Sequence, residues 1–331
     1  MAIEGFRPIT GAGTNPDHPD WGAAGGQFLR VGGSHYGDGI STPAGGDRPS
    51  ARAVSNAVNA QDGSIPNSFG VSDLFWLWGQ FIDHDLDLVA DSTSPEAFNI
   101  LVPTGDPYFD PFSTGTQVIN LTRSGFDPDT GTDVPREQIN TLTPFMDASM
   151  IYGVDAARAA FLRADDGKLK ISDEGYLPNN DGSFPNGGPG GAFAPIAGDV
   201  RAGENVALLS MHTIFVREHN RLVDEIAAKH PEYDAERLYQ EAKKIVEAEI
   251  QVITYKEFLP LLIGEGALPA YTGFNPNVNP QIATEFATAA FRLGHTLLSA
   301  NLLRIEENGD ATGFGSLALR DAFFNTSALT D

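Results

Sequence analysis

The sequence predicts a mainly α-helical domain with long structured loops and little β structure. Helical periodicity of apolar residues occupies three long stretches in the second half of the chain, at residues 203–229, 235–262 and 280–300. The first half instead contains long runs rich in Gly, Pro, Asn and Asp, which interrupt regular structure. Because 41% of the residues are hydrophobic, a chain of 331 residues can fill one sizeable core. We therefore expect a single domain over residues 1–331.

The predicted elements of the first half are short and lie between loops. Residues 1–50 include GAGTNPDHPDWGAAGGQF and STPAGGDRPS, and this composition predicts an irregular N-terminal arm. Ser72 stands directly before an apolar run and is the expected N-cap of a helix at residues 72–88. The other expected segments are a helix at 50–61, loops over 92–140 with a strand within TQVINLTR, a helix at 155–163 and a loop at 173–202. Loops of this length in a compact domain usually serve binding.

Composition and charge exclude several classes of protein. The 44 acidic and 21 basic residues give a formal net charge of −23, which repels nucleic acids and anionic membranes and favours cationic ligands. The chain has no cysteine, so disulfides, thiolate nucleophiles and cysteine metal sites are excluded. It has neither a run of ~20 apolar residues nor the pattern of a signal peptide. Because this charge suits a calcium-rich external setting, we expect an extracellular or secreted protein without an N-terminal signal peptide.

The run LFWLWGQFIDHDLD, residues 74–87, places acidic side chains on a helix that otherwise looks buried. Helical spacing puts Asp85 on one face with Trp78 and Phe81. A carboxylate buried there without a partner would cost several kcal/mol unless a cation neutralised it. We therefore expect a hard metal ion beside Asp85.

The neighbouring stripe of the same helix carries Gln80, Asp83, His84 and Asp87. Gln80 and His84 are one turn apart, so an amide and a proton-accepting imidazole face a common space. This pairing is typical of a general acid–base site. The alternative is a solvated polar helix end, which is the commoner setting for one histidine among aspartates and the one we expect for Asp87.

A second segment, TPFMDAS at residues 143–149, carries oxygen atoms at alternate positions. The candidate ligands are the Thr143 hydroxyl, the Phe145 carbonyl, the Asp147 carboxylate and the Ser149 hydroxyl. An all-oxygen set with carboxylates suits Ca²⁺ rather than zinc. Such residues are also ordinary in loops, so the predicted calcium site depends on pairing this segment with Asp85.

Near residue 200 the chain reads GDVRAGENVALLSMHTIFVREHNRL. Arg201 and Glu204 lie at the expected junction between loop and helix, where a side chain can project into a pocket. The alternative is that they form a surface ion pair. His212 and His219 lie on the helix that follows, but no third ligand has a suitable spacing. We therefore expect structural roles for both histidines.

The helix expected over TEFATAAFRLGHTLLSANLL is largely apolar but carries Arg292 and His295. A single histidine in such a helix is commonly a hydrogen-bonded core residue. Gly294 beside it would, however, let a flat ligand approach, and Arg292 lies one turn earlier. A haem with an axial imidazole from His295 and a propionate at Arg292 fits this arrangement.

Four segments resemble, in order and spacing, motifs of the animal-type haem peroxidases of the peroxidase-cyclooxygenase superfamily: WGQFIDHDLD, TPFMDASMIYG, RAGEN…LLSMHTIFVREHNRL and FRLGHTL. The similarity continues into the arm (RPITGAGTNP, HYGDGISTP, RPSARAVSN) and so covers essentially the whole chain. It implies a haem-peroxidase helical domain, from a bacterial-type member or from a C-terminally truncated one. The chain ends at DAFFNTSALTD, where the family domain normally continues.

The resemblance assigns roles on the peroxide side of a haem. His84 corresponds to the distal histidine, which takes a proton from H₂O₂ and returns it to the leaving oxygen. Gln80 would position peroxide, water or a halide. Arg201 would stabilise the negative charge that develops on the peroxide.

The resemblance also assigns contacts to the cofactor. His295 corresponds to the proximal iron ligand and Arg292 to a propionate partner. Asp83 and Glu204 correspond to the carboxylates that form ester bonds to haem b. The residue after Glu204 is Asn205 rather than the methionine that forms a further covalent link in one mammalian member, so that link is not expected.

The implied function is a haem-dependent peroxidase that reduces H₂O₂ and oxidises a halide, thiocyanate or small aromatic donor. It would also bind Ca²⁺ through Asp85, Thr143, Phe145, Asp147 and Ser149. Two alternatives are a haem fatty-acid dioxygenase of the same superfamily and a non-catalytic calcium-binding adhesion or matrix module. The acidic helix WGQFIDHD is closer to the peroxidases than to the dioxygenases.

Overall fold

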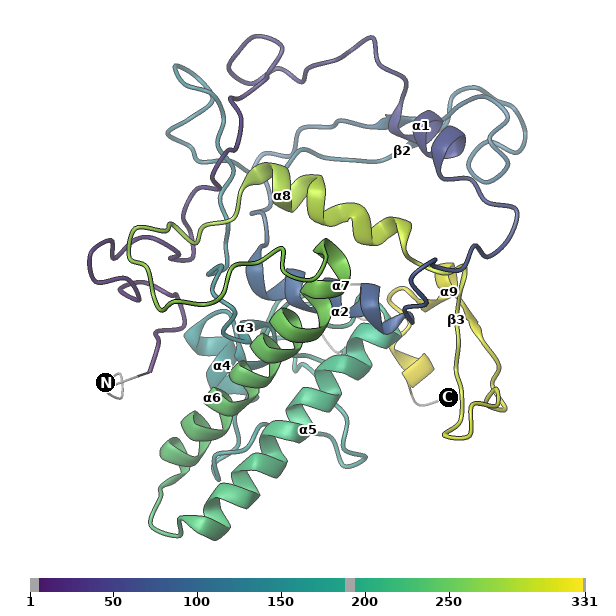
Figure 1. Cartoon of the computed structure of the whole chain (residues 1–331). Coiled ribbons are helices and arrows are strands. Elements are labelled where there is room, and N and C mark those ends of the chain that lie inside the picture. Colours follow the sequence, from purple (N-terminus) through teal and green to yellow (C-terminus); the bar gives the residue numbers. More distant parts are fainter. Residues whose placement is uncertain (1–5, 188–193, 330–331) are drawn as a thin grey trace.

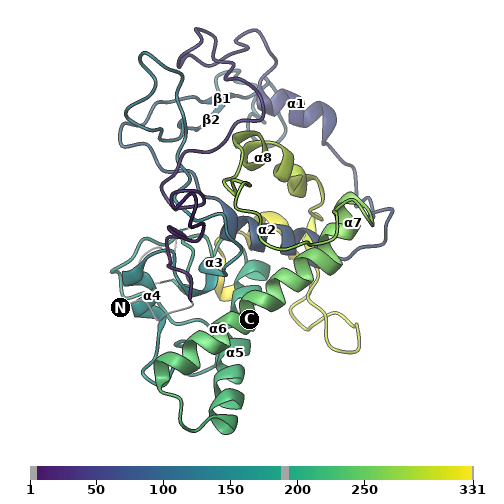
Figure 2. The same cartoon turned by 60° about the vertical axis from the view of Figure 1, so that its left-hand side comes forward.

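Two long helices, α5 (Val206–Lys229) and α6 (Ala235–Ile253), form the largest helical unit of the computed structural model and lie side by side (Figures 1 and 2). The structure describes residues 6–187 and 194–329. Short parts of the predicted arm, of the loop at 173–202 and of the C-terminus therefore lie outside the described residues. Within them the regular structure is mainly helical with short strands, as the sequence predicts.

Helix α5 begins at Val206 because Asn205 is an extended N-cap. The φ and ψ angles of Asn205 are −146° and 163°, and its side-chain oxygen accepts a hydrogen bond of 2.8 Å from the backbone N–H of Leu208. The predicted start at residue 203 is therefore wrong. Residues 199–204 instead form a turn that leads into the helix.

The helix predicted over residues 235–262 is divided into three parts. Helix α6 ends at Ile253, a π-helical turn (η2, Thr254–Phe258) follows, and α7 covers Leu259–Ile263. Pro260 lies in the first turn of α7 and has no N–H to bond to an earlier carbonyl, so the α-helical pattern is interrupted here.

Helix α2 (Leu74–Leu86) crosses the centre of the molecule near α5 (Figure 1). Phe81 has no exposed surface and stacks on Phe215 of α5, with 5.2 Å between the ring centroids. Full burial of such a side chain contributes roughly 2 kcal/mol. The predicted cap at Ser72 is wrong, because Asp73 occupies the N-cap position and makes no side-chain capping hydrogen bond.

The helix predicted over residues 280–300 is shorter and breaks near its middle. Helix α8 covers Thr284–Thr288, and a 3₁₀-helical segment, η3 (Ala290–Thr296), follows it. The guanidinium of Arg292 contributes to this break, because its Nε donates a hydrogen bond of 2.7 Å to the carbonyl of Ala287. The 3₁₀ segment leaves His295 exposed, so this residue is not the buried core histidine of the alternative interpretation.

Shorter elements surround these helices (Figure 1). Two helices and one strand lie close to their predicted positions: α1 (Ala51–Val58), α4 (Ala156–Leu162) and β2 (Val118–Ile119), which pairs antiparallel with β1 (Ile100–Leu101). The remaining elements are α3 (Ser149–Tyr152), the antiparallel pair β3 (Asn301–Leu302) and β4 (Leu317–Ala318), α9 (Leu319–Ala322) and η4 (Thr326–Leu329).

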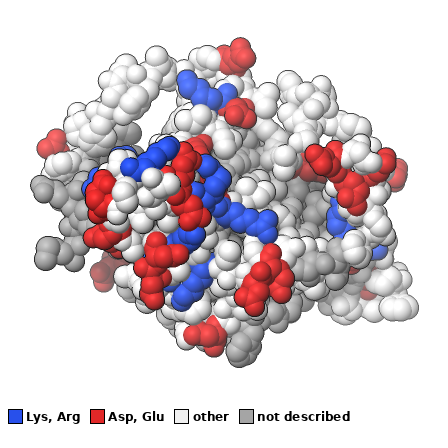
Figure 3. Space-filling view, turned by 90° about the horizontal axis from the view of Figure 1, so that it is seen from below, with Lys and Arg blue, Asp and Glu red and all other residues white. Residues whose placement is uncertain are grey.

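On the face shown in Figure 3, Lys and Arg side chains interleave with Asp and Glu side chains. Arg221 of α5 contacts Glu218 and Glu225 on the same helix, and Lys243 of α6 contacts Glu247. Exposed pairs of this kind add little stability. Most basic residues of these two helices are thus paired with nearby acids, and Arg217 instead donates to the carbonyl of Gly175. No helix among the described residues is long and apolar enough to cross a membrane.

His212 and His219 of α5 are buried and hydrogen-bonded inside the protein, in agreement with the structural roles expected for them. The Nδ1–H of His212 donates to the carbonyl of Leu208 at 2.9 Å. His219 donates from Nε2 to the carbonyl of Gly167 and accepts the hydroxyl of Tyr152 at Nδ1, both at 3.0 Å. Burial lowers the pKa of each imidazole to about 4.

The lowered pKa of His212 predicts a loss of stability in acid. The folded-state pKa of about 4 lies below the ordinary value of 6.5. The stability that the neutral imidazole contributes is therefore complete above pH 6.5 and is lost as the pH falls toward 4. In this window His212 adds a slope of about 1.4 kcal/mol per pH unit to the free energy of unfolding. The substitution His212→Asn keeps a donor near the position of Nδ1 and should remove that slope in urea unfolding between pH 7 and 5. Equal slopes for His212→Asn and the exposed control His230→Asn would contradict the prediction.

Candidate functional site

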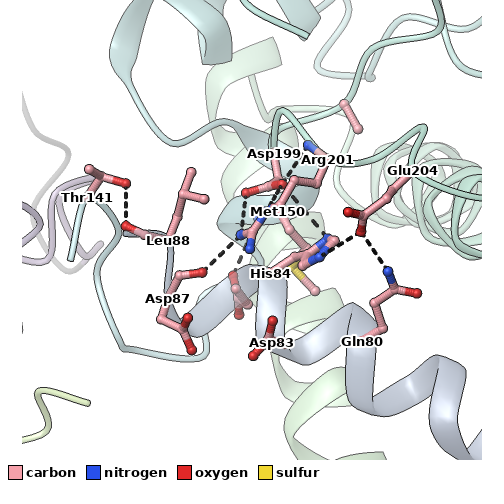
Figure 4. Close-up of polar contacts among 12 residues, drawn as sticks. Gln80, Asp83, His84, Asp87, Leu88, Thr141, Met150, Asp199, Arg201 and Glu204 are labelled. Atoms are coloured by element: carbon pink, nitrogen blue, oxygen red, sulfur yellow. Dashed lines mark hydrogen bonds and ion pairs between the residues drawn. The ribbon is translucent and has the colours of Figure 1, made fainter. Parts of the chain in front are cut away.

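One cavity of about 340 Å³ brings together the seven residues predicted to act on haem or peroxide. This volume lies in the range of small-molecule sites. The residues come from α2, from the turn at 199–204 and from η3, and Figure 4 shows the first two groups facing each other. The polar residues lining the cavity are Gln80, Asp83, His84, Arg201, Glu204, Arg292 and His295. Five aromatic side chains also line the walls, together with several leucines: Phe75, Trp76, Phe258, Phe291 and Phe323.

His84 presents a neutral imidazole in this cavity. Its Nε2 lies 3.6 Å from Glu204 Oε2 and its Nδ1 lies 3.9 Å from Asp199 Oδ1, and the buried Nδ1 has no hydrogen-bond partner. Burial, followed by the charge of Arg201, holds the pKa of His84 well below its usual range. A neutral imidazole can accept a proton, so His84 can act as a base at neutral pH.

Arg201 is held by a carboxylate that the sequence analysis did not identify. Its Nε and Nη2 donate to the two oxygens of Asp199 at 2.8 and 2.9 Å, and Nη2 also donates to the carbonyl of Asp87 at 3.0 Å. Burial raises the pKa of Asp199, but Arg201 outweighs it and lowers that pKa to about 2. The partner of Arg201 is therefore Asp199 and not Glu204. The alternative interpretation, a surface ion pair between Arg201 and Glu204, is wrong.

A local signal for Asp199 is present in the sequence GDVR. The backbone N–H of Arg201 donates to Asp199 Oδ1 at 2.8 Å, which closes a tight turn two residues long. A Cβ atom at Gly198 would collide with the carbonyl oxygen of Ser149 in α3, so only glycine lets the chain approach α3 here. Gly-Asp two residues before an arginine thus indicates a buried turn that orients the guanidinium.

Gln80 and Glu204 contact each other beside Nε2 of His84, whereas Nδ1 faces Asp199. The amide nitrogen of Gln80 donates to Glu204 Oε2 at 2.8 Å, and the amide oxygen of Gln80 accepts from Asn205 Nδ2 at 2.9 Å. Burial raises the pKa of Glu204 above its ordinary value. The three residues form one hydrogen-bonded chain from the N-cap of α5 to the cavity.

Arg292 joins η3 to two acids of α2. Its Nη1 donates to Asp83 Oδ2 at 2.9 Å, and its Nη2 lies 3.6 Å from Asp87 Oδ1. Asp87 is buried rather than solvated, which corrects the expectation from the sequence. Burial, and then the charge of Asp83, raises the pKa of Asp87 to about 7. A periodic pattern cannot indicate this burial, because the covering segment comes from the distant η3.

The residues predicted to bind calcium gather around the start of α3. Asp85 Oδ1 accepts the hydroxyl of Ser149 at 2.9 Å, and Oδ2 accepts the N–H of Ala148 at 3.0 Å. The N–H of Ser149 donates to Asp147 Oδ1 at 3.0 Å, and the N–H of Asp147 donates to the carbonyl of Phe145 at 2.8 Å. The hydroxyl of the remaining candidate, Thr143, donates to the carbonyl of Gly22 at 2.8 Å.

Asp85 and Asp147 are two buried carboxylates, and the charge of Asp147 acts on Asp85. Burial, followed by the charge of Asp147, raises the pKa of Asp85 to about 8. Burial also raises the pKa of Asp147 to about 6, against the opposing charges of Lys243 and Arg7. The described residues contain no cluster of three or more His, Cys, Asp or Glu side chains suited to a metal. The predicted set has only two such side chains, and its other ligands are hydroxyl and carbonyl oxygens.

The cavity fits a flat macrocycle with anionic substituents. Its walls are largely apolar, and Arg292 supplies a cation, which pairs with Asp83 in this structure. His295 and His84 reach this cavity from separate helical elements. A mainly helical protein with a largely apolar cavity between two histidine-bearing elements offers a site suited to a haem.

Comparison with known proteins gives the family. The family model for animal haem peroxidases matches residues 6–331, and the chain belongs to this family. It is 35% identical to peroxidasin of Drosophila melanogaster over 96% of this chain and 24% of that protein. The structure of peroxidase A from Dictyostelium discoideum superposes with a TM-score of 0.87 at 33% identity, covering 99% of this chain and 66% of that one.

The fold is also shared beyond the peroxidases. A fatty acid alpha-dioxygenase of Arabidopsis thaliana superposes with a TM-score of 0.76 at 18% identity, over 98% of this chain and 54% of that one. At this identity the similarity concerns the fold alone. The chain thus spans between about a quarter and about two thirds of the length of these similar proteins.

The pairing of Asp199 with Arg201 predicts that removing one charge lowers the free energy of unfolding more than removing both. Asp199→Asn leaves a buried guanidinium without its counter-charge and should lower the free energy of unfolding by about 3–5 kcal/mol. The double variant Asp199→Asn/Arg201→Gln removes both charges and should be more stable than the single variant in urea unfolding. Arg221→Gln, which breaks an exposed pair on α5, should change nothing measurable. A double variant less stable than Asp199→Asn would contradict this account.

Proposed function

We propose that this chain is a haem-dependent peroxidase that reduces H₂O₂ and oxidises a halide, thiocyanate or small aromatic donor. The observation that carries the proposal is the meeting of neutral His84, cationic Arg201 and a second histidine, His295, at one cavity. Haem b bound there supplies a redox-active iron that can exchange electrons with peroxide and then with the donor. The protein supplies the proton transfers and the electrostatics.

His84 is the proton carrier in this proposal. Its neutral imidazole accepts a proton from one oxygen of H₂O₂ and returns it to the other oxygen as that oxygen leaves as water. Arg201 stabilises the negative charge that develops on the departing oxygen. Because Asp199 holds the guanidinium with two hydrogen bonds, Arg201 is oriented before peroxide binds. Gln80 positions the peroxide, water or halide beside His84.

Other residues would hold the cofactor. His295 would be the axial iron ligand, and Arg292 would pair with a propionate. Asp83 and Glu204, the carboxylates that line the cavity, would form ester bonds to haem b. The exposure of His295 supports its role, because a ligand must reach its imidazole nitrogen.

The charge balance around Asp85 supports a calcium ion in the same protein. A cation bound by Asp85, Asp147, the hydroxyls of Thr143 and Ser149, and the Phe145 carbonyl would relieve the repulsion between the two buried carboxylates. The hydroxyl of Ser149, which now donates to Asp85, would turn its oxygen toward the ion. Such a site, with the net charge of −23, supports an external, calcium-rich setting.

The peroxidase is favoured over the two alternatives. The peroxidasin and the peroxidase A compared above are 35% and 33% identical to this chain, whereas the dioxygenase is 18% identical. A non-catalytic adhesion or matrix module would not need a buried Asp199–Arg201 pair beside an unprotonated histidine.

Haem reconstitution tests the function. The haem-loaded protein should show a Soret band that shifts on addition of H₂O₂, because His84 and Arg201 assist cleavage of the O–O bond. His84→Ala should slow this shift by about 10²–10⁴-fold, while the exposed control His230→Ala should not change it. A folded chain that takes up no haem, or a His84→Ala variant with the wild-type rate, would overturn the proposal.

Calcium addition tests the second site. When the chelator-treated protein receives Ca²⁺ at about 100 times its Kd, the free energy of unfolding should rise by about 2.7 kcal/mol. Asp85→Asn should abolish this rise, because it removes one of the two buried carboxylates. Asp62→Asn, at an exposed position, should respond like the wild type. Equal responses of both variants in thermal unfolding would show that the ion binds elsewhere.

A further inference from the structure

We propose that Asn205 is a positioning residue that orients the carboxamide of Gln80, so that its N–H groups and not its oxygen face the cavity. This end of the cavity then binds hydrogen-bond acceptors, such as a small anion or a peroxide oxygen, in preference to donors. The inference rests on the proposed peroxidase function and adds to it the residue that determines the polarity of the Gln80 amide.

The orientation of the Asn205 side chain is fixed by the helix that it caps. A backbone N–H can only donate, so the atom of Asn205 that lies 2.8 Å from the N–H of Leu208 must be its oxygen. The nitrogen Nδ2 therefore occupies the other branch of the amide. Exchanging the two atoms would cost α5 its side-chain cap and would place two donors against each other.

The orientation of Gln80 follows from that of Asn205. Asn205 Nδ2 lies 2.9 Å from Gln80 and can only donate, so the contacted atom of Gln80 must be its oxygen, Oε1. The remaining branch, Nε2, donates to Glu204 Oε2 at 2.8 Å. This series of hydrogen bonds thus begins at the backbone N–H of Leu208, which can only donate, and ends at the carboxylate of Glu204. If the Gln80 amide were reversed, its nitrogen would face Asn205 Nδ2 and its oxygen would face Glu204 Oε2, and neither pair could form a hydrogen bond.

One N–H of Gln80 is available to a ligand. The amide nitrogen carries two hydrogens, and the bond to Glu204 uses one of them. Gln80 lines the cavity together with His84, whose imidazole is neutral, and Arg201, which carries a positive charge. A small anion or a peroxide oxygen would meet an N–H donor and a cation at this end. Without a donor at residue 205, Gln80 could rotate and present its oxygen, which would repel such ligands.

Two substitutions at residue 205 separate this role from the capping role. Asn, Asp and Ser are similarly good N-caps, so Asn205→Asp and Asn205→Ser should both retain α5. Aspartate replaces that donor with an acceptor, so either orientation of the amide would set the Gln80 oxygen against a carboxylate, and the amide should leave its wild-type position. Serine leaves the amide without its fixed donor. Thermal unfolding should change little in either variant, which keeps a folding defect distinct from the proposed effect.

The first readout is the side-chain amide of Gln80 in the haem-free protein. With ¹⁵N-labelled glutamine, the Gln80 NH₂ resonances can be assigned by their loss in Gln80→Glu. They should shift in Asn205→Asp and should lose part of their protection from hydrogen exchange in Asn205→Ser. Resonances identical to the wild type in both variants would overturn the proposal, whether or not the protein binds haem.

The second readout is thiocyanate binding to the haem-loaded protein, followed by the Soret difference spectrum. Loss of one hydrogen bond to an anion should weaken binding about tenfold in Asn205→Asp, with a smaller loss in Asn205→Ser. Weakening in the aspartate variant alone would indicate added negative charge instead of amide orientation, and would overturn the proposal. Failure to take up haem would count against the proposed function, and the amide resonances would still decide the role of Asn205.

Discussion

The buried ion pair between Asp199 and Arg201 is the interaction on which the rest of the site depends. Removing both charges from water is costly, and two short hydrogen bonds between the partners offset that cost. A third bond, from Arg201 to the carbonyl of Asp87, fastens the turn before α5 to the end of α2. The same positive charge, together with burial, keeps His84 neutral. One pair therefore fixes the turn before α5, and its cation adds to the burial that keeps His84 neutral.

Helix α2 accommodates three buried acids by three different physical means. Asp83 contacts the guanidinium of Arg292, which comes from η3. Asp85 receives hydrogen bonds from the start of α3, and burial beside Asp147 favours its protonated form. Burial and the charge of Asp83 raise the pKa of Asp87. The acids of this largely apolar helix thus find their partners on α3 and η3, which come from distant parts of the chain.

The part of the site that follows from local periodicity could be predicted, and the part that depends on distant contacts could not. Gln80, His84 and Asp83 share a helical stripe, and the structure places all three at one cavity. Asp199 was not identified, because its role depends on burial that no periodic pattern encodes. The burial of Asp87 likewise requires Arg292 from a distant segment. The predicted helix over 280–300 breaks where the Arg292 side chain bonds to the carbonyl of Ala287, five residues earlier, and the same guanidinium also reaches Asp83 of α2.

The glycine at residue 198 has a mechanical consequence for the two proposed sites. It brings the turn that holds Arg201 against α3, and α3 in turn binds Asp85 of α2. Arg201 then returns to α2 through Asp87, so α2, α3 and the turn form a closed ring of contacts. A ring of this kind has little slack, because each member is fixed by the other two. Adjacent residues on one helix, His84 and Asp85, are therefore held by the same closed set of contacts, although one faces the cavity and the other faces α3.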